Sequence, residues 1–387
     1  MGDQNMTRRE FLGTCLKGGA ALGLLPLVGS TRAATVASQA VLAEQGNVAQ
    51  HPARYWHIKD GKETKCDLCP RGCEIQPGER GTCGDRENIN GAYTSMVYAK
   101  PCEMRLDPME KGPFFHFLAA SETLALGFAG CNLDCKYCQS YVFAKARPEA
   151  TDNKNLSPQG LADQLVAKGY RSITFTFSEP LQVIEYVVDV ARLARARGIR
   201  VLVHTAGYAC SQPFEDLCNS VDAINVDLKG FSEDFYKQMT GGGLEPVLNN
   251  IRRAANHSNI WLELTNLVVP GYNDRDDEFA TMCDWIVQNC GADTPLHVTK
   301  FFPQYKLRSV PPTPNDTLKR LRKLAYQSGL RYVYLGNMPG DPGESSYCPQ
   351  CGAKMIGRVG TDVRFTEFDP DRGICTKCGL SIPGVWS

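Results

Sequence analysis

Short hydrophobic runs alternate with amphipathic stretches between about residues 120 and 337. The runs are rich in β-branched residues, which favours buried strands, and the stretches between them repeat their apolar positions with a helical period. Strands and helices that alternate in this way form parallel sheets from βα units. The predicted strands are Thr123–Phe128, Ser172–Phe177, Ile199–His204, Ala223–Asp227, Ile260–Val268, Leu296–Phe301 and Tyr332–Leu335.

Two of the intervening helices have ends that the sequence marks. Ser157 is placed to cap a helix whose first residue is Pro158, and a second helix is predicted from about Leu181 to Arg197, where Gly198 ends it. A complete eight-unit barrel needs roughly 250 residues, more than this region offers. The predicted fold is therefore α/β, a partial (β/α) barrel of about six or seven units over residues 120–340.

The first 34 residues have the character of an export leader. Thr7-Arg8-Arg9-Glu10-Phe11-Leu12 precedes an apolar, Gly- and Ala-rich run over residues 16–28, which is shorter than the roughly 20 residues of a membrane-spanning helix. The segment resembles a twin-arginine leader, which predicts export to the periplasm of a protein folded around its cofactors. A leader that does not function, leaving the protein in the cytoplasm, is the alternative. No other segment is long enough to span a membrane stably.

Residues 35–119 are predicted to hold a linker and then a cysteine-rich module. Residues 35–60 lack periodicity, and the module that follows, up to about Cys102, is rich in turns and poor in apolar residues. A metal is therefore its expected organiser, either zinc or a second iron–sulfur cluster, with zinc slightly preferred. Cys102 is an alternative ligand. The expected ligands are Cys66, Cys69, Cys73 and Cys83.

The tail, residues 341–387, carries a second group of four cysteines. Y-C-P-Q-C-G at 347–352 and C-T-K-C-G at 375–379 form a pattern typical of a zinc ribbon. Four thiolates in two such turns favour a closed tetrahedral site, so structural zinc is preferred to a redox cluster. The expected ligands are Cys348, Cys351, Cys375 and Cys378.

The composition favours metal binding by cysteines and gives no indication of a highly charged partner such as a nucleic acid. Eleven of the 17 cysteines fall in three tight groups, a spacing that favours metal ligation over disulfides. Core packing is expected for the other six. Lys plus Arg equals Asp plus Glu at 42 each, and no basic stripe studded with aromatic residues is present, so a nucleic-acid module is disfavoured. The six cysteines outside the groups are Cys15, Cys102, Cys210, Cys218, Cys283 and Cys290.

The central motif is C-N-L-D-C-K-Y-C at 131–138, directly after the first predicted strand. Cubane clusters normally take four thiolates, and this loop supplies Cys131, Cys135 and Cys138, which leaves one iron without a local protein ligand. An open iron can bind the amino and carboxylate groups of S-adenosylmethionine (SAM) and so place its sulfonium against the cluster. The position agrees, because functional groups of such barrels gather at the carboxyl ends of the strands.

This motif resembles the C-x3-C-x2-C motif of the radical SAM superfamily, with the usual aromatic residue, Tyr137, before the third cysteine. Several flanking segments narrow the resemblance to the radical SAM member of the AmmeMemoRadiSam system, which is related to pyruvate formate-lyase activating enzymes. The resemblance covers about residues 60–387. The segments are C-D-L-C-P-R-G-C-E-I-Q-P-G-E-R-G-T-C, D-P-M-E-K-G-P-F-F-H-F, V-D-L-K-G-F, V-V-P-G-Y-N-D, Y-L-G-N-M-P-G and I-P-G-V-W.

The resemblance implies a radical SAM oxidoreductase. Its [4Fe–4S] cluster would cleave SAM reductively to a 5′-deoxyadenosyl radical, which abstracts hydrogen from a peptide, a protein glycine or a small substrate. A low-potential electron donor and a protein or peptide substrate are the implied partners, and glycyl-radical activation is an analogy within this class. The residues that the resemblance assigns to SAM contacts, or that resemble elements near its site, are Glu179 of T-F-S-E-P, Thr205 of T-A-G-Y, Asp227 and Lys229 of D-L-K-G, His297 and Asn337.

The alternative function is an electron-transfer or metal-binding scaffold without SAM turnover. Such a carrier would use four cluster ligands and would not need Glu179, Asp227 or Lys229 at the strand ends. Two residues also have purely structural alternatives. For Lys229 the alternative is an ion pair on a loop. For His297, which lies between apolar residues, the alternative is a hydrogen-bonded histidine in the core.

Overall fold

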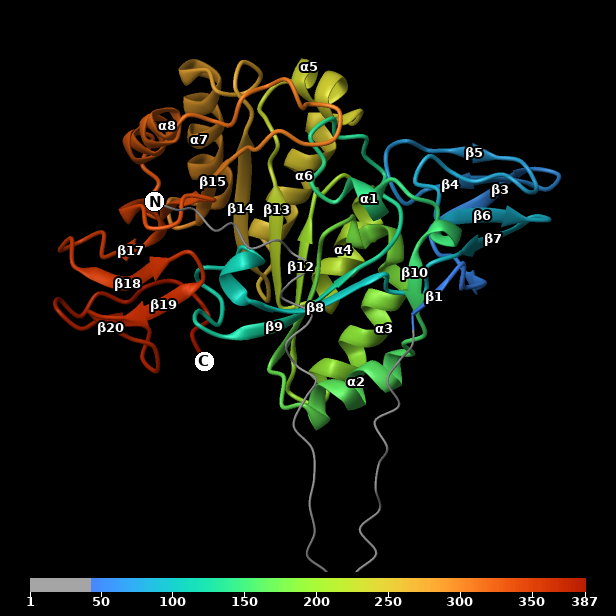
Figure 1. Ribbon diagram of the computed structural model, residues 1–387, viewed down its shortest axis with the longest axis horizontal. Coiled ribbons are helices and arrows are strands. Elements are labelled where there is room, and N and C mark those ends of the chain that lie inside the picture. The colour runs from blue at the N-terminus through green and yellow to red at the C-terminus, as the bar shows by residue number, and fades with distance from the viewer. Residues whose placement is uncertain (1–42) are drawn as a thin grey trace, which may run out of the picture. The chain divides into compact units, whose positions relative to one another are not determined.

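A sheet of eight strands forms the centre of the protein, in the computed structural model that describes residues 43–387 (Figure 1). The predicted leader at residues 1–34 and Cys15 lie outside the described residues. The strand order is β16-β15-β14-β13-β12-β11-β9-β8, and all neighbours are parallel except β8 and β9. The strands are β8 Glu103–Pro108, β9 Glu122–Gly127, β11 Ser172–Phe175, β12 Arg200–Thr205, β13 Ala223–Asp227, β14 Trp261–Val268, β15 Leu296–Lys300 and β16 Val333–Gly336.

The predicted α/β fold is confirmed. All seven predicted strands are present, and their ends differ from the expectation by no more than two residues. The antiparallel edge strand β8 was not predicted. Its residues E-M-R-L-D-P are mostly exposed or half-buried, with Leu106 39% exposed, so no hydrophobic alternation marks it in the sequence.

Helices connect the parallel strands, and consecutive helices pack against one another in a single layer (Figure 1). Ser157 accepts a hydrogen bond from Gly160 N (3.1 Å) and so caps the first of them, as expected. The helix predicted from Leu181 begins instead with a 3₁₀ turn at Pro180–Val183. The principal helices are α2 Pro158–Ala167, α3 Ile184–Arg195, α4 Ser211–Ser220, α6 Leu244–Ala255, α7 Asp276–Cys290 and α8 Asn315–Gln327.

The cysteine-rich module consists of short strands around Cys66, Cys69, Cys73 and Cys83. Three of these strands and β1 fall in the interval 43–66, much of which was expected to be a linker, because strands of two to five residues are too short to show periodicity. Leu68, Ile75 and Val97 are buried in the main core, so the module has no separate core. The strands are β1 Ala43–Gln45, β2 His51–Pro52, β3 Trp56–Asp60, β4 Glu63–Cys66, β5 Glu74–Ile75, β6 Arg86–Ile89 and β7 Ala92–Ser95, and β1 pairs with β10 Asp152–Lys154.

The tail has a small core of its own beside β16. Met355, Ile356 and Phe368 pack there with Phe115 and Tyr334 of the barrel. A backbone contact returns the chain end to the barrel, where Leu118 N donates to the carbonyl of residue 385 (2.6 Å). The tail strands are β17 Ser346–Tyr347, β18 Lys354–Val359, β19 Asp362–Phe365, β20 Phe368–Asp369 and β21 Ile374–Cys375.

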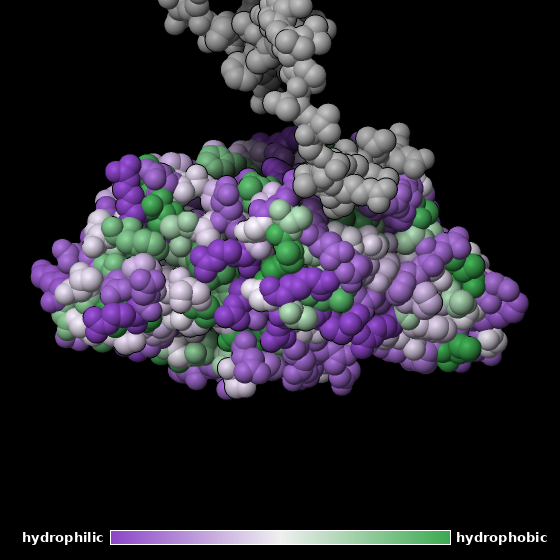
Figure 2. Space-filling view, turned by 90° about the horizontal axis from the view of Figure 1, so that it is seen from below, coloured by the Kyte–Doolittle hydropathy of each residue, from purple (hydrophilic) through white to green (hydrophobic). Residues whose placement is uncertain are grey.

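Among residues 43–387, no helix combines the length and apolar character needed to cross a membrane. In Figure 2, hydrophilic residues are spread over the face turned to the viewer, and hydrophobic residues form scattered small groups between them. All the cysteines of the described part of the chain are free thiols, which agrees with their expected use as ligands or core residues.

Candidate active site

A cavity of about 620 Å³ lies where the parallel strands end. This volume is within the range of pockets that enclose small molecules. Its walls include Arg105 of β8 and Lys111, together with Glu344 and Thr361 from the tail. The lining residues that the sequence analysis singled out are Cys131, Tyr137, Cys138, Glu179, Thr205, Asp227, Lys229, His297 and Asn337.

The loop of Cys131, Cys135 and Cys138 follows β9 and is held by backbone contacts. Asp134 N donates to Thr240 O (2.7 Å), and Lys136 N donates to Met239 O (2.9 Å). Cys131 and Cys138 line the cavity, whereas Cys135 is buried and does not line it. The three thiols that the sequence placed in one motif are therefore presented by one fixed loop.

Burial holds these thiols in their neutral form when no metal is bound. It raises the pKa of Cys131 to about 12, against the opposing charge of Lys145. It also raises the pKa of Cys135, where the Lys229 ammonium opposes it, and the pKa of Cys138. A metal binds the thiolate, so the loop is a set of soft ligands that a metal would deprotonate.

Glu179 is a buried carboxylate with both oxygens held in place. Oε1 accepts from Thr205 Oγ1 (2.6 Å) and from Leu181 N (3.1 Å), and Oε2 accepts from Ala206 N (2.9 Å). Burial raises its pKa, and these donors oppose the shift. Phe177, two residues earlier, has φ of +68°, a conformation that glycine adopts more easily and that costs a larger residue about 1–3 kcal/mol. The local strain therefore accompanies a carboxylate fixed at the cavity wall.

Asp227, at the end of β13, joins two basic side chains. Its Oδ2 accepts from Lys229 Nζ (2.8 Å), and its Oδ1 lies 2.9 Å from His204 Nε2. Burial alone would raise the pKa of Asp227, but Lys229 and His204 outweigh it and hold the pKa below its usual range. Lys229 also interacts electrostatically with Cys135 and Tyr137. The ion pair considered as the structural alternative for Lys229 is thus present, and it lies in the cavity wall.

His297 combines the two roles considered for it, because it lines the cavity and is also satisfied in the core. Its Nε2 lies 2.6 Å from Glu263 Oε2, and both side chains are almost fully buried. Glu263 also accepts from Phe115 N (3.0 Å), His116 N (2.8 Å) and Trp261 Nε1 (3.0 Å). Burial would raise the pKa of Glu263, but His297 outweighs it and lowers the pKa.

Sequence reasoning missed His204 and Glu263. His204 stands in the last two residues of β12, so the rule that functional groups gather at strand ends could have found it. Glu263 lies inside β14, and its partners come from the segment before β9 and from β15, so no local signal marks it. The buried hydroxyl of Tyr137 has no hydrogen-bond partner among the described residues, and this side chain lines the cavity.

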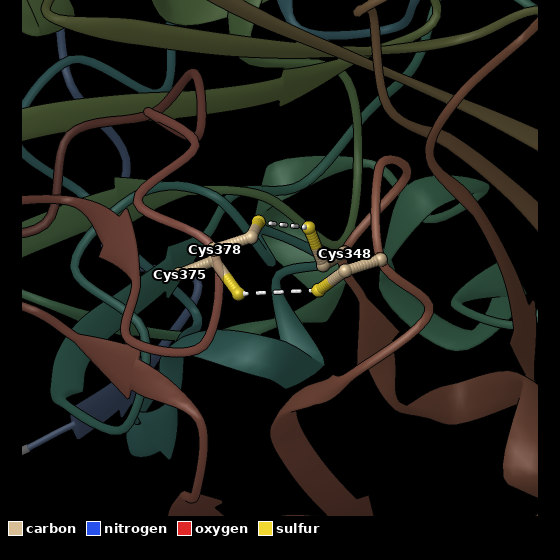
Figure 3. Close-up of side chains that lie close together, drawn as sticks. Cys348, Cys375 and Cys378 are labelled. Atoms are coloured by element: carbon tan, nitrogen blue, oxygen red, sulfur yellow. Dashed lines mark hydrogen bonds between the residues drawn. The ribbon is translucent and has the colours of Figure 1, made fainter.

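The tail cysteines converge on one point (Figure 3). Cys348 Sγ lies 3.5 Å from Cys378 Sγ, and Cys351 Sγ lies 3.7 Å from Cys375 Sγ. All four sulfurs are within 4.8 Å of one another, so this group is able to hold a metal ion. Within the described part of the chain, the N-terminal cysteines do not form such a group. Cys102 is also separate, since its thiol contacts the Gly127 carbonyl (3.7 Å).

Comparison with known proteins places the chain in a family. Residues 127–285 match the Radical SAM superfamily. The uncharacterised protein MJ0808 of Methanocaldococcus jannaschii is 38% identical over 330 residues, which cover 85% of this chain and 98% of that protein. The pyruvate formate-lyase-activating enzyme of Clostridium pasteurianum is 25% identical over 215 residues, which cover 51% of this chain and 87% of the enzyme.

Among solved structures, a radical SAM methyltransferase from Sphaerobacter thermophilus is 14% identical and gives a TM-score of 0.46, over 75% of this chain and 76% of that one. The family assignment does not depend on this likeness. It rests on the matched segment, which contains the three-cysteine loop, and on the relatives that are similar over most of their own length. The chain therefore belongs to the radical SAM superfamily and is homologous to pyruvate formate-lyase activating enzymes.

Proposed function

We propose that this protein cleaves SAM reductively at an iron–sulfur cluster bound by Cys131, Cys135 and Cys138. The observation that carries the proposal is that two of these thiols line the same cavity as the fixed carboxylate of Glu179 and the Asp227–Lys229 pair. An electron carrier has no use for such groups beside its cluster. The alternative of a metal scaffold without turnover is therefore disfavoured.

The residues present fit the cofactors that the superfamily implies. Three thiols are the donor set for a cluster with one open iron, and the Tyr137 hydroxyl at the cavity wall lacks a partner among the described residues. The cavity volume suits a nucleoside-sized ligand. When bound, the cluster and SAM supply one-electron chemistry that removes a hydrogen atom from the substrate.

The side chains around the cavity have separate positioning roles. Glu179, with both oxygens fixed, is placed to accept from the ammonium group of SAM. Lys229 is placed to pair with a carboxylate, and Asp227 holds its ammonium in position. The positive charge of Lys229 near Cys135 also stabilises the thiolate form of the loop.

Product analysis tests the proposal. After anaerobic reconstitution and reduction, the chain should convert SAM to 5′-deoxyadenosine and methionine, and Cys131→Ala should abolish both products. Cys283→Ala, which removes a buried thiol of α7 far in sequence from the motif, is the matched control and should keep the activity. Equal product formation by the Cys131→Ala variant would contradict the cluster assignment.

We propose further that the physiological substrate is a peptide, a protein glycine or a small molecule, used within the AmmeMemoRadiSam system with a low-potential electron donor. Homology to pyruvate formate-lyase activating enzymes supports this class of enzyme. The tail adds residues to the cavity wall, which is compatible with a substrate other than a protein glycine. SAM cleavage by the enzyme in the presence of deuterated candidate substrates tests this point. Transfer of deuterium into 5′-deoxyadenosine identifies the substrate, and its absence removes that candidate.

Structural zinc is our proposal for the tail site, because its sulfur spacings of 3.5 and 3.7 Å suit a tetrahedral ion with Zn–S bonds of about 2.3 Å. Elemental analysis of the purified chain, with and without Cys348→Ser, tests it. Loss of iron in place of zinc would contradict it.

For the leader we propose twin-arginine export. Replacing Arg8 and Arg9 with lysine should leave the protein in the cytoplasm, as fractionation would show, and unchanged export would contradict the assignment.

A further inference from the structure

Two of the N-terminal thiols and a tyrosine hydroxyl lie around Gly81. A Cβ placed on Gly81 would stand 3.3 Å from Tyr93 Oη, 3.6 Å from Cys83 Sγ and 3.7 Å from Cys73 Sγ. The thiols of Cys66 and Cys69 belong to the same group, since they interact electrostatically with each other and with Cys73. The four free thiols therefore lie in one neighbourhood of the module.

The N-terminal thiols do not form the kind of close group that the tail cysteines form. A tetrahedral zinc ion with bonds of about 2.3 Å brings its sulfurs within about 3.8 Å of one another. Among the described residues, the tail cysteines form a group able to hold a metal ion, with all ligand atoms within 4.8 Å, and the N-terminal thiols form no such group. A multi-iron cluster binds each thiolate to a different iron, so its ligands stand further apart. The three thiols of the radical SAM loop do not form such a close group either.

Two buried polar groups beside these thiols have no partner. The Tyr93 hydroxyl, on a residue only 2% exposed, has no hydrogen-bond partner among the described residues, although it and two of the sulfurs lie close to the Cβ position of Gly81. Both carboxylate oxygens of the fully buried Asp85 also lack a donor. Buried groups of this kind are normally satisfied, so a missing ligand or water is indicated. Tyr93 is placed to donate to a sulfur of a bound cluster.

The module also touches the radical SAM loop directly. A Cβ on Gly130, the residue before Cys131, would stand 2.7 Å from Asp85 Oδ2 and 2.8 Å from Cys83 O. From the other side, Arg71 Nε donates to Asn132 O (2.5 Å). The two cysteine loops are thus neighbours, and a redox centre in one would lie next to the other.

We propose that Cys66, Cys69, Cys73 and Cys83 bind a second iron–sulfur cluster and not zinc. Its role as an electron relay rests on the proposed function. One electron from a reduced iron–sulfur or flavin carrier protein converts this cluster to its one-electron-reduced state, and transfer of that electron to the cluster at Cys131 restores the oxidised state. No bond or proton changes in the relay itself.

Iron analysis without the radical SAM site tests the proposal. A full-length Cys131→Ala/Cys135→Ala/Cys138→Ala chain, reconstituted anaerobically with iron and sulfide, should retain about four irons and four sulfides. It should show an electron paramagnetic resonance signal after reduction. Further replacement of Cys66 and Cys69 with alanine should remove both, whereas Cys218→Ala, in α4, should remove neither. A second zinc ion per chain, beyond the one proposed for the tail, and no iron in the triple variant would overturn the proposal.

A milder variant covers the case in which loss of two cysteines unfolds the module. Tyr93→Phe in the triple variant should keep the iron and shift the resonance signal or the midpoint potential, because hydrogen bonds to cluster sulfurs tune the potential. An unchanged signal and potential would overturn the placement of the cluster. SAM cleavage is not measured in these variants, so their outcome is separate from that of the proposed function.

Discussion

The two four-cysteine modules have the same number of ligands and different surroundings. The tail cysteines are close together within a small core that includes Met355 and Phe368, beside the barrel. The N-terminal cysteines form no such close group, and residues between them, such as Leu68 and Ile75, belong to the main core. Two modules with similar cysteine motifs along the chain thus differ in how their sulfurs gather and in what is buried beside them. On this difference we base our proposals of zinc for the tail and an iron–sulfur cluster for the N-terminal module.

The largest effect is expected from removing two ligands of the tail. Zinc binding in modules of this kind is worth about 10–16 kcal/mol, so Cys348→Ser/Cys351→Ser should unfold the tail and release zinc. Hydrogen exchange should show lost protection after residue 345 and retained protection in the barrel strands. The iron content should stay the same. A tail that remains protected without zinc would remove the distinction between the modules.

Arg358 should give the next largest effect, because it is the buried link between the tail and the barrel. Its guanidinium lies 3.6 Å from the Glu110 carboxylate, 4.1 Å from the Phe115 ring centroid, and is fully buried. Arg358→Met should lower the free energy of unfolding by about 3–5 kcal/mol, since Glu110 is left unpaired. Arg364→Met, at a side chain 80% exposed, is the control in denaturant titrations and should change little. Equal effects of the two would contradict the link.

Gly130→Ala should disturb the corresponding contact of the N-terminal module. The alanine would meet Asp85 and the Cys83 carbonyl, and φ is +89°. Gly169 is the control position, because its φ is +68° and its Cβ position has open space around it. An alanine there therefore measures the cost of the backbone conformation without a steric clash. Gly169→Ala should cost about 1–2 kcal/mol, and Gly130→Ala about 1–3 kcal/mol more by overpacking. Urea unfolding measures both, and equal losses would show that the modules are not in tight contact.

The smallest expected effect is the pH dependence of the stability that Glu263 contributes through its contacts with Phe115 and His116. Glu263 holds the backbone of Phe115 and His116, and its folded pKa is lowered, with burial outweighed by His297. The contribution of ionised Glu263 to the free energy of unfolding is therefore fully present above the unfolded pKa of about 4.3, and it is lost as the pH falls through the folded pKa. The difference in unfolding free energy between wild type and Glu263→Gln should be constant from pH 7 to 5 and shrink below about pH 4. A difference that grows in acid would contradict this sign.

The sequence predicted those parts of the fold and site that have local signals. Buried parallel strands are continuous apolar runs, so all seven were found, whereas the half-exposed β8 was not. The cysteine motifs and the strand-end residues Glu179 and Asp227 could be named because chain position or resemblance marks them. Asp85 and Glu263 could not, because their importance comes from neighbours that are distant in sequence.

Resonance spectroscopy of the reduced wild-type chain with and without SAM tests the central claim most directly. In the proposed arrangement, only the cluster at Cys131, Cys135 and Cys138 would have an iron free to bind SAM, whereas the N-terminal cluster would have four protein ligands. Two signals are expected, of which SAM shifts one, and that one should disappear in the variant without these three cysteines. Signals that SAM leaves unchanged would contradict an open iron in the cavity and, with it, the proposed SAM cleavage.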